Sequence, residues 1–203
     1  MSGPETRRGR RGYNFYPDMR NPRYALVAYV KNPVAEFVEN LRRELHPDLP
    51  HLAAHVTLLP PRVLRGTEGA ALQLLEKVCA LNEPFEVSLG EMETFLPDTP
   101  TVYIRVTHGA RRMCDLHSDL NTQVLAFEEE WPYVPHLTIV KMATQLPAKH
   151  AFCVASERWL RYSGERRILL ERLTFVREEE PDRWVDLAPV TLGRTLVSRQ
   201  AQT

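Results

Sequence analysis

The sequence contains little cysteine and no long apolar run. Its 203 residues include three cysteines, Cys79, Cys114 and Cys153, and their odd number and wide spacing argue against a disulfide framework. No apolar run approaches the roughly 20 residues that a membrane helix needs. The N-terminus also lacks the apolar core of a secretory signal. We therefore expect three reduced cysteines, no membrane contact and a cytoplasmic location.

The sequence also lacks a net charge, because 26 basic side chains balance 26 acidic ones. Proteins that bind duplex nucleic acid through phosphate contacts are usually basic overall or carry a basic stripe. The balance argues against a general duplex binder and remains compatible with an enzyme that has one small anionic substrate.

Motifs that bind cofactors or metals are absent from the sequence. It contains neither GxxxxGK[ST] nor GxGxxG, so nothing supports the use of ATP or a dinucleotide cofactor. The sequence contains no HxH, and its one HxxxH, from His51 to His55, lies in a stretch without a helical pattern. We expect no cofactor and no metal.

Residues 1–20 differ from the rest of the chain. They contain Arg7, Arg8, Arg10 and Arg11, separated by glycine and without an apolar period. This pattern predicts a disordered basic arm. The arm is a solvated tail in the simplest interpretation, and an RNA-contacting arm or an organelle-targeting segment are the alternatives.

Residues 21–203 alternate between strand and helix patterns and predict one domain. Expected strands cover residues 24–30, 55–59, 85–89 with an extension over 91–95, 101–106, 137–141, 168–176 and 184–188. Expected helices cover residues 33–45, 67–81 with Thr67 as the cap, 109–127 and 147–162. Pro60 and Pro61 are expected to stop the second strand. This mixed order, with neighbouring hairpins, predicts an α+β fold with largely antiparallel sheets.

One four-residue pattern occurs twice on the expected strands. His55 to Leu58 reads HVTL, and His136 to Ile139 reads HLTI. Each copy follows one helix and precedes another, which indicates an internal duplication and two lobes within one domain. Alternate side chains of a strand share a face, so each strand presents a histidine and a threonine together and buries two apolar residues.

This set of side chains suits chemistry at a phosphoryl group. A neutral histidine removes a proton from an attacking hydroxyl or water, and a protonated one gives a proton to the leaving oxygen. The hydroxyls of Thr57 and Thr138 can hold the non-bridging oxygens of the phosphate. We assign His136 as the base and His55 as the acid, although the symmetry of the site leaves the reverse assignment open.

The HVTL and HLTI pair resembles the signature of the 2H phosphoesterase superfamily, which includes 2′-5′ RNA ligase-like proteins and cyclic phosphodiesterases. The resemblance extends from about Tyr24 to Ala188. It implies a bilobed, pseudo-twofold α+β fold with a central cleft, and metal-independent catalysis on a 2′,3′-cyclic phosphate or a 2′-5′ phosphodiester. It also implies that His55, Thr57, His136 and Thr138 form the site.

Further residues near the motifs are candidate substrate contacts. Tyr103 and Tyr133, and also Phe95, carry rings on which a base can stack, although such rings more often belong to the core. His51 precedes the first motif and can border the cleft, and Arg62 follows the motif and can contact a substrate phosphate.

Lys141 follows the second motif, where the resembled family often has an arginine. It lies five positions after His136, so an ideal strand directs it to the opposite face. This parity argues against a contact between Lys141 and substrate phosphate.

The expected partner is an RNA terminus or a small nucleotide, bound by a monomer with a role in RNA processing. A module that binds RNA ends or nucleotides without turnover is the main alternative. A scaffold that docks a partner through the arginine arm is a third class, and it would be insensitive to replacement of His55 or His136.

Overall fold

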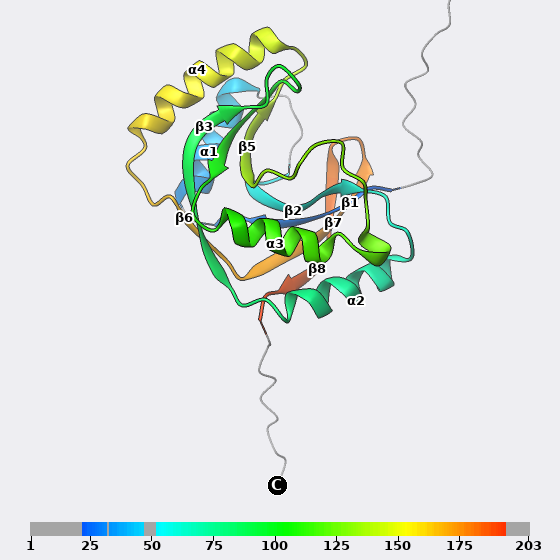
Figure 1. Cartoon of the computed structure of the whole chain (residues 1–203). Helices are drawn as coiled ribbons and strands as arrows, with labels where there is room; N and C mark the ends of the chain where they lie inside the picture. The colour runs from blue at the N-terminus through cyan, green and yellow to red at the C-terminus, as the bar shows by residue number, and fades with distance from the viewer. Residues whose placement is uncertain (1–21, 32, 47–51, 194–203) are drawn as a thin grey trace, which may run out of the picture.

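The structure is a computed structural model that describes residues 22–31, 33–46 and 52–193. The expected arm, residues 1–20, and His51 lie outside the described residues. The strands are β1 (Tyr24–Tyr29), β2 (His55–Arg62), β3 (Phe85–Thr94), β4 (Thr101–Val106), β5 (His136–Lys141), β6 (Arg167–Leu170), β7 (Arg172–Glu180) and β8 (Arg183–Thr191) (Figure 1). The helices are α1 (Pro33–Leu45), α2 (Glu68–Cys79), α3 (Ala110–Leu120), a 3-10 turn at Gln123–Leu125, and α4 (Gln145–Arg161).

The strands form one sheet in the order β6-β3-β4-β5-β2-β1-β7-β8, and the neighbouring strands pair antiparallel. The expected α+β class is therefore confirmed. The two motif strands, β2 and β5, lie side by side at the centre. Each has its own outer neighbour, β1 for β2 and β4 for β5, and each pair is connected through a helix. The two halves are thus related by a pseudo-twofold axis between β2 and β5.

Each of these two connecting helices packs against the other half. Helix α1 contacts β5, and α3 contacts β2, while α4 packs on β3, β4 and β5. Helix α2 contacts α3 and β8, so α2 and α3 lie together (Figure 1). The apolar faces of the motif strands are buried beneath these helices, including Val56, Leu58, Leu137 and Ile139. Burial of each such side chain stabilises the fold by about 1.5–3 kcal/mol.

Most of the expected boundaries agree with the structure. Thr67 caps α2, because its hydroxyl oxygen accepts a hydrogen bond of 3.2 Å from the backbone N–H of Ala70. Strand β3 continues through Gly90 to Thr94, as the expected extension required.

Several expected ends are wrong, among them those of the second strand and the third helix. Strand β2 does not stop at Pro60 but continues to Arg62, which pairs with Tyr24 of β1. Proline lacks a backbone N–H and so removes one hydrogen-bond donor from the β1–β2 pair. The register of this pair is irregular there, so the missing hydrogen bond is tolerated. Helix α3 ends at Leu120 instead of Phe127. There the side chain of Asn121 accepts the backbone N–H of Phe127 at 2.9 Å, and this bond favours a turn over another helical turn.

The expected strand 168–176 is two strands, which occupy distant places in the sheet. Strand β6 pairs with β3 and β7 pairs with β1, and Glu171 is the single residue between them. The first and seventh strands of the order are therefore joined by one residue, so the sheet bends enough to bring the end of β6 next to the start of β7. The closing hairpin is confirmed as β7 and β8.

Candidate active site

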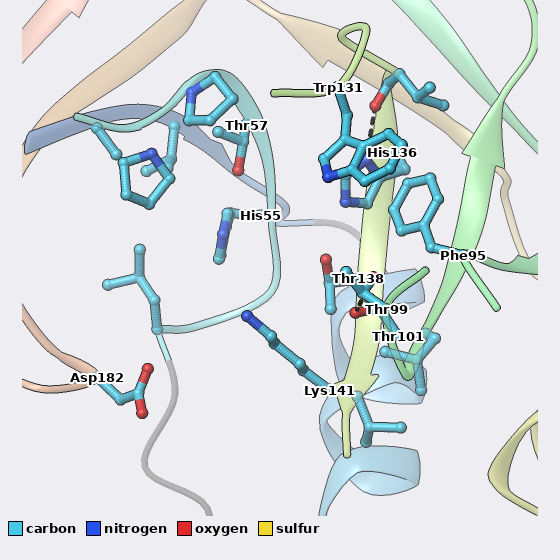
Figure 2. Close-up of a pocket in the computed structure, with 18 of the residues that line it drawn as sticks. His55, Thr57, Phe95, Thr99, Thr101, Trp131, His136, Thr138, Lys141 and Asp182 are labelled. Carbon is cyan, nitrogen blue, oxygen red and sulfur yellow. Dashed lines mark hydrogen bonds between the residues drawn. The ribbon is translucent and has the colours of Figure 1, made fainter. Parts of the chain in front are cut away.

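The two motifs meet across the β2–β5 pair. Val56 lies opposite Leu137 in antiparallel register. This register places each histidine across from the threonine of the other strand, His55 by Thr138 and His136 by Thr57. All four side chains are half-buried and line one cavity (Figure 2).

Both imidazoles are oriented by the backbone in the same way. His55 Nδ1 lies 2.7 Å from the carbonyl oxygen of Ala53, and His136 Nδ1 lies 2.6 Å from that of Val134. A carbonyl oxygen only accepts, so each Nδ1 carries the proton that it donates. In the neutral ring the Nε2 atom then keeps its lone pair for a substrate.

Burial lowers the pKa of both histidines. The pKa of His55 falls to about 4: burial is the main cause, the bond to Ala53 opposes it, and the positive charges of Arg42 and His136 lower it further. Burial also lowers the pKa of His136 against the bond to Val134. Each ring is therefore neutral at pH 7 until an anion enters the cleft and favours its charged form.

Two aromatic rings pack against His136. Phe95 and Tyr103 stack on each other with centroids 4.1 Å apart, and both centroids lie 5.1 Å from that of the imidazole. Tyr103 is only 4% exposed, and its hydroxyl donates to Glu93. The expected substrate contact through Tyr103 is therefore corrected: the ring supports His136 from beneath. Phe95 does line the cavity.

A β-bulge interrupts both motif strands at the same position. The register of β5 against β4 shifts between Thr138 and Val140, and the register of β2 against β1 shifts between Thr57 and Leu59. In each strand the third and fourth residues after the histidine are both buried. The extra residue reverses the alternation of faces from that point onward.

The bulge brings Lys141 to the cleft. With Ile139 and Val140 both buried, Lys141 follows His136 and Thr138 on the same face and lines the cavity, where Figure 2 shows it beside His55. The parity argument from an ideal strand is therefore wrong at this position. Pro60 holds the equivalent place on β2 and also lines the cavity, so of these two equivalent positions one carries a cation and the other does not.

Helices α1 and α3 each pack against the strand of the other half, and side chains of both helices bind carbonyl groups at the bulges. Arg42 of α1 donates to Thr138 O at 2.6 Å and to Ile139 O at 3.1 Å. His117 of α3 donates from Nδ1 to Leu58 O at 2.7 Å. A buried polar side chain thus binds backbone carbonyl groups at each bulge.

Arg42 also connects the two halves of the site. Its guanidinium donates to Leu52 O at 3.1 Å and to Glu39 at 3.0 Å, and Glu39 accepts the backbone N–H of Ala54 at 2.7 Å. Ala54 immediately precedes His55. The sequence held a signal for this role, because a charged residue occupies a position on the apolar stripe of α1.

Of the other expected contacts, Arg62 lies away from the cavity, whereas Tyr133 lines it. Arg62 is 1% exposed and donates to Glu129 at 2.6 Å and to Asn121 at 2.7 Å, so the expected contact with a substrate phosphate does not fit its position. Tyr133 lines the cavity, but its ring stacks on His117 and its hydroxyl donates to Thr57 O at 2.6 Å. Tyr133 thus fixes the strand that carries Thr57.

The cavity has a volume of about 1020 Å³ and mostly apolar walls. Sequence reasoning missed Trp131 and Trp184, which line it from the loop before β5 and from β8. Within residues 22–31, 33–46 and 52–193, no group of three or more histidine, cysteine or acidic side chains is arranged to hold a metal. In the same ranges no helix has the length and apolar character needed to cross a bilayer. The three cysteines are free.

Known proteins share this sequence pattern and this fold. The model of the family described as the 2′-5′ RNA ligase superfamily matches residues 30–182. A protein of Oceanobacillus iheyensis named "putative phosphoesterase" is 25% identical over 120 residues, which are 59% of this chain and 70% of that protein. A protein of the same name from Bacillus anthracis is 21% identical over 170 residues, which are 83% of this chain and 96% of that protein.

Solved structures show the same fold. LigT of E. coli in complex with 3′-AMP superposes with a TM-score of 0.60 at 15% identity, over 86% of this chain and all of LigT. A protein of Thermus thermophilus gives 0.62 at 19% identity, over 85% of this chain and all of that one. LigT has also been solved in complex with NADP⁺ and with ATP.

Proposed function

The chain belongs to the 2′-5′ RNA ligase superfamily, and from this membership we propose that it is a two-histidine phosphodiesterase. Its proposed substrate is a 2′,3′-cyclic phosphate or a 2′-5′ phosphodiester of RNA or a nucleotide. One observation carries the proposal: two imidazoles on adjacent strands face one cavity, and each uses Nδ1 for the backbone and leaves Nε2 for a substrate.

Hydrolysis of the cyclic ester needs two proton transfers at one phosphorus atom. A water oxygen attacks phosphorus while one histidine takes its proton, and the bond from phosphorus to one ribose oxygen breaks. The second histidine gives a proton to that oxygen, which yields a phosphate monoester and a free hydroxyl. Each transfer contributes about 10²–10⁴ in rate and requires no metal. The hydroxyls of Thr57 and Thr138 bind the non-bridging oxygens.

The charge of Arg42 favours one assignment of acid and base. Arg42 and His136 both lower the pKa of His55. The charge of Arg42 therefore disfavours a proton on His55, against the weaker opposing effect of Glu39. We infer that His55 is the base and His136 the acid in hydrolysis, the reverse of the assignment made from the sequence. The roles exchange in the ligation direction.

Lys141 supplies the cationic contact for the phosphate. Its side chain is exposed in the cavity beside His55 and Thr138, whereas Arg42 is bonded to the backbone and to Glu39. A lysine is a mobile point charge, so it follows the phosphate as negative charge develops on the oxygens. The nucleotide complexes of LigT support a nucleotide as the substrate of this fold.

Turnover of adenosine 2′,3′-cyclic phosphate and of a 2′-5′-linked diadenosine phosphate, in excess EDTA, tests this function. We expect the wild type to be active, and His55→Ala and His136→Ala each to lose at least 100-fold in kcat. The double variant should lose little more, since the pair acts as a unit. His150→Ala, an exposed position on α4, is the control. Tight nucleotide binding without turnover would instead support the binding-module alternative.

A further inference from the structure

The segment that leads into His136 is bonded to the opposite motif. Tyr133 stands three residues before His136, and its hydroxyl donates to the carbonyl oxygen of Thr57 at 2.6 Å. The next residue, Val134, supplies the carbonyl oxygen that lies 2.6 Å from His136 Nδ1. The backbone of these two residues therefore connects the orientation of one imidazole with the position of the threonine on the neighbouring strand (Figure 2).

The other half of the site has an equivalent connection, made by a different side chain. Leu52 stands three residues before His55, in the place that corresponds to Tyr133. Leucine has no hydroxyl, and Arg42 supplies the connection instead. It donates to the carbonyl oxygen of Leu52 at 3.1 Å and to that of Thr138 at 2.6 Å. Both halves thus connect the threonine carbonyl of one motif to the segment that precedes the histidine of the other.

The ring of Tyr133 is held against β2. His117 of α3 stacks on it, with ring centroids 4.1 Å apart and an interplanar angle of 5°. The same imidazole donates from Nδ1 to Leu58 O at 2.7 Å, and its Nε2 lies 3.4 Å from Glu129. His117 is buried, so one face of the Tyr133 ring is covered by a side chain that is itself bonded to β2.

The hydroxyl of Tyr133 acts as a hydrogen-bond donor that keeps its proton. Burial raises the pKa of Tyr133 above its usual value, and Cys114 and Glu129 raise it further. A phenol has one proton to donate, and the carbonyl oxygen of Thr57 receives it. The hydroxyl is therefore engaged with the backbone, although the ring lines the cavity.

We propose that Tyr133 is a positioning residue that sets the place of the Thr57 hydroxyl relative to His136. The phosphate has to contact both groups at once, so a shift between the two strands would move it away from the imidazole that transfers the proton. A misplacement of about 1 Å can cost about 100-fold in rate. This proposal rests on the proposed function, because it takes Thr57 and His136 as parts of the phosphate site.

Steady-state kinetics of Tyr133→Phe test this role, because the substitution keeps the ring and removes only the hydroxyl. We expect kcat for adenosine 2′,3′-cyclic phosphate to fall by about 10- to 100-fold. The fall should be the same across the pH profile, because Tyr133 transfers no proton. Tyr162→Phe is the matched control: Tyr162 follows the end of α4, its hydroxyl donates to Glu165 O, and the variant should match the wild type.

A double-mutant cycle shows whether Tyr133 acts through Thr57. Thr57→Val removes the hydroxyl that is positioned, so Tyr133→Phe should cost less than about threefold in that background. In the Thr138→Val background Tyr133→Phe should keep its full cost, because Arg42 binds the carbonyl group of Thr138 independently. Equal losses in the two backgrounds, or the loss of one limb of the pH profile in Tyr133→Phe, would overturn the proposal.

An NMR measurement separates failure of this proposal from failure of the proposed function. The ¹³C signal of the Thr57 carbonyl group reports the hydrogen bond, and the ¹⁵N signals of the imidazoles report their surroundings. Tyr133→Phe should shift the signals of Thr57 and His136 and leave those of His55 in place, whether or not the wild type is active. Unchanged His136 signals would overturn the proposal even in an active enzyme. A wild type that turns over neither substrate would overturn the proposed function, and a shift of the His136 signals would still support the connection through Tyr133.

Discussion

Arg42 on α1 donates a hydrogen bond of 2.6 Å to the carbonyl oxygen of Thr138 at the bulge of β5. The same guanidinium reaches Leu52, on the segment that leads to His55. The Arg42 side chain therefore forms hydrogen bonds with the backbone close to both His55 and His136, although Arg42 belongs to neither motif.

Replacement of Arg42 by methionine should change the pH dependence as well as the rate. The substitution keeps much of the side-chain volume but abolishes the hydrogen bonds to the buried carbonyl groups. It also removes a positive charge that lowers the pKa of His55. We expect a loss of stability of about 1–3 kcal/mol, a tenfold or larger fall in kcat, and an acid limb of the kcat/KM profile shifted to higher pH. Arg43→Met is the control, because Arg43 is exposed on the same helix and donates to Glu39 O and Asn40 on that helix. If the acid limb of Arg42→Met stayed at the wild-type pH, the charge of Arg42 would not control the pKa of His55.

Replacement of Lys141 tests the bulge in β5. Lys141→Met should raise KM for the cyclic substrate about tenfold and lower kcat, because the phosphate loses its cationic contact. Lys141→Arg should retain most of the activity. Lys149→Met, on the exposed part of α4, should match the wild type. If Lys141→Met also matched the wild type, the lysine would not contact the phosphate.

The pH profile of kcat/KM should be bell-shaped with an acidic optimum. The free enzyme needs one neutral and one charged histidine, and burial lowers both pKa values below 6.5. Both limbs should therefore lie below about pH 6.5, with the lower one near the His55 pKa of about 4. Measurement of kcat/KM from pH 3.5 to 9 checks this, and a single limb would argue against the pair.

Stability should also fall on acidification, independently of activity. The pKa of His55 is about 4 in the folded chain and about 6.5 in the unfolded chain, so the unfolded state binds more protons between these values. The free energy of unfolding should decrease as pH falls from about 6.5 to about 4, and His136 should add to the same trend. His55→Gln cannot take up this proton, so its midpoint of urea unfolding should depend less steeply on pH. An identical slope in both proteins would disprove the lowered pKa.

The strands of the site were predictable because alternation is visible in the sequence. HVTL and HLTI each alternate polar and apolar residues, and the structure buries them in that order. The bulges were not predicted, although each follows the alternating run as two consecutive apolar residues, Leu58-Leu59 and Ile139-Val140. A local pattern does not reveal that a helix from the other half will satisfy the freed carbonyl groups.

The other wrong predictions have one cause, which is contact between residues far apart in the sequence. Arg62 appeared to be a phosphate contact because it follows a motif, but Glu129 and Asn121 draw it into the interior. Glu171 interrupts a continuous strand pattern, because β6 and β7 pair with strands at opposite ends of the sheet. Periodicity describes one segment, whereas these outcomes depend on which partner the segment finds.

Pro60 and Lys141 occupy equivalent positions in the two halves of the cleft, and this difference gives the cleft a direction. A cationic side chain lines the cavity at one of these positions and an uncharged ring lines it at the other. Charge is therefore distributed unevenly over two strands whose backbones are nearly symmetric. Any ligand with one charged and one apolar end has a single favoured orientation in the cleft. The duplicated scaffold therefore binds the two ends of such a ligand differently.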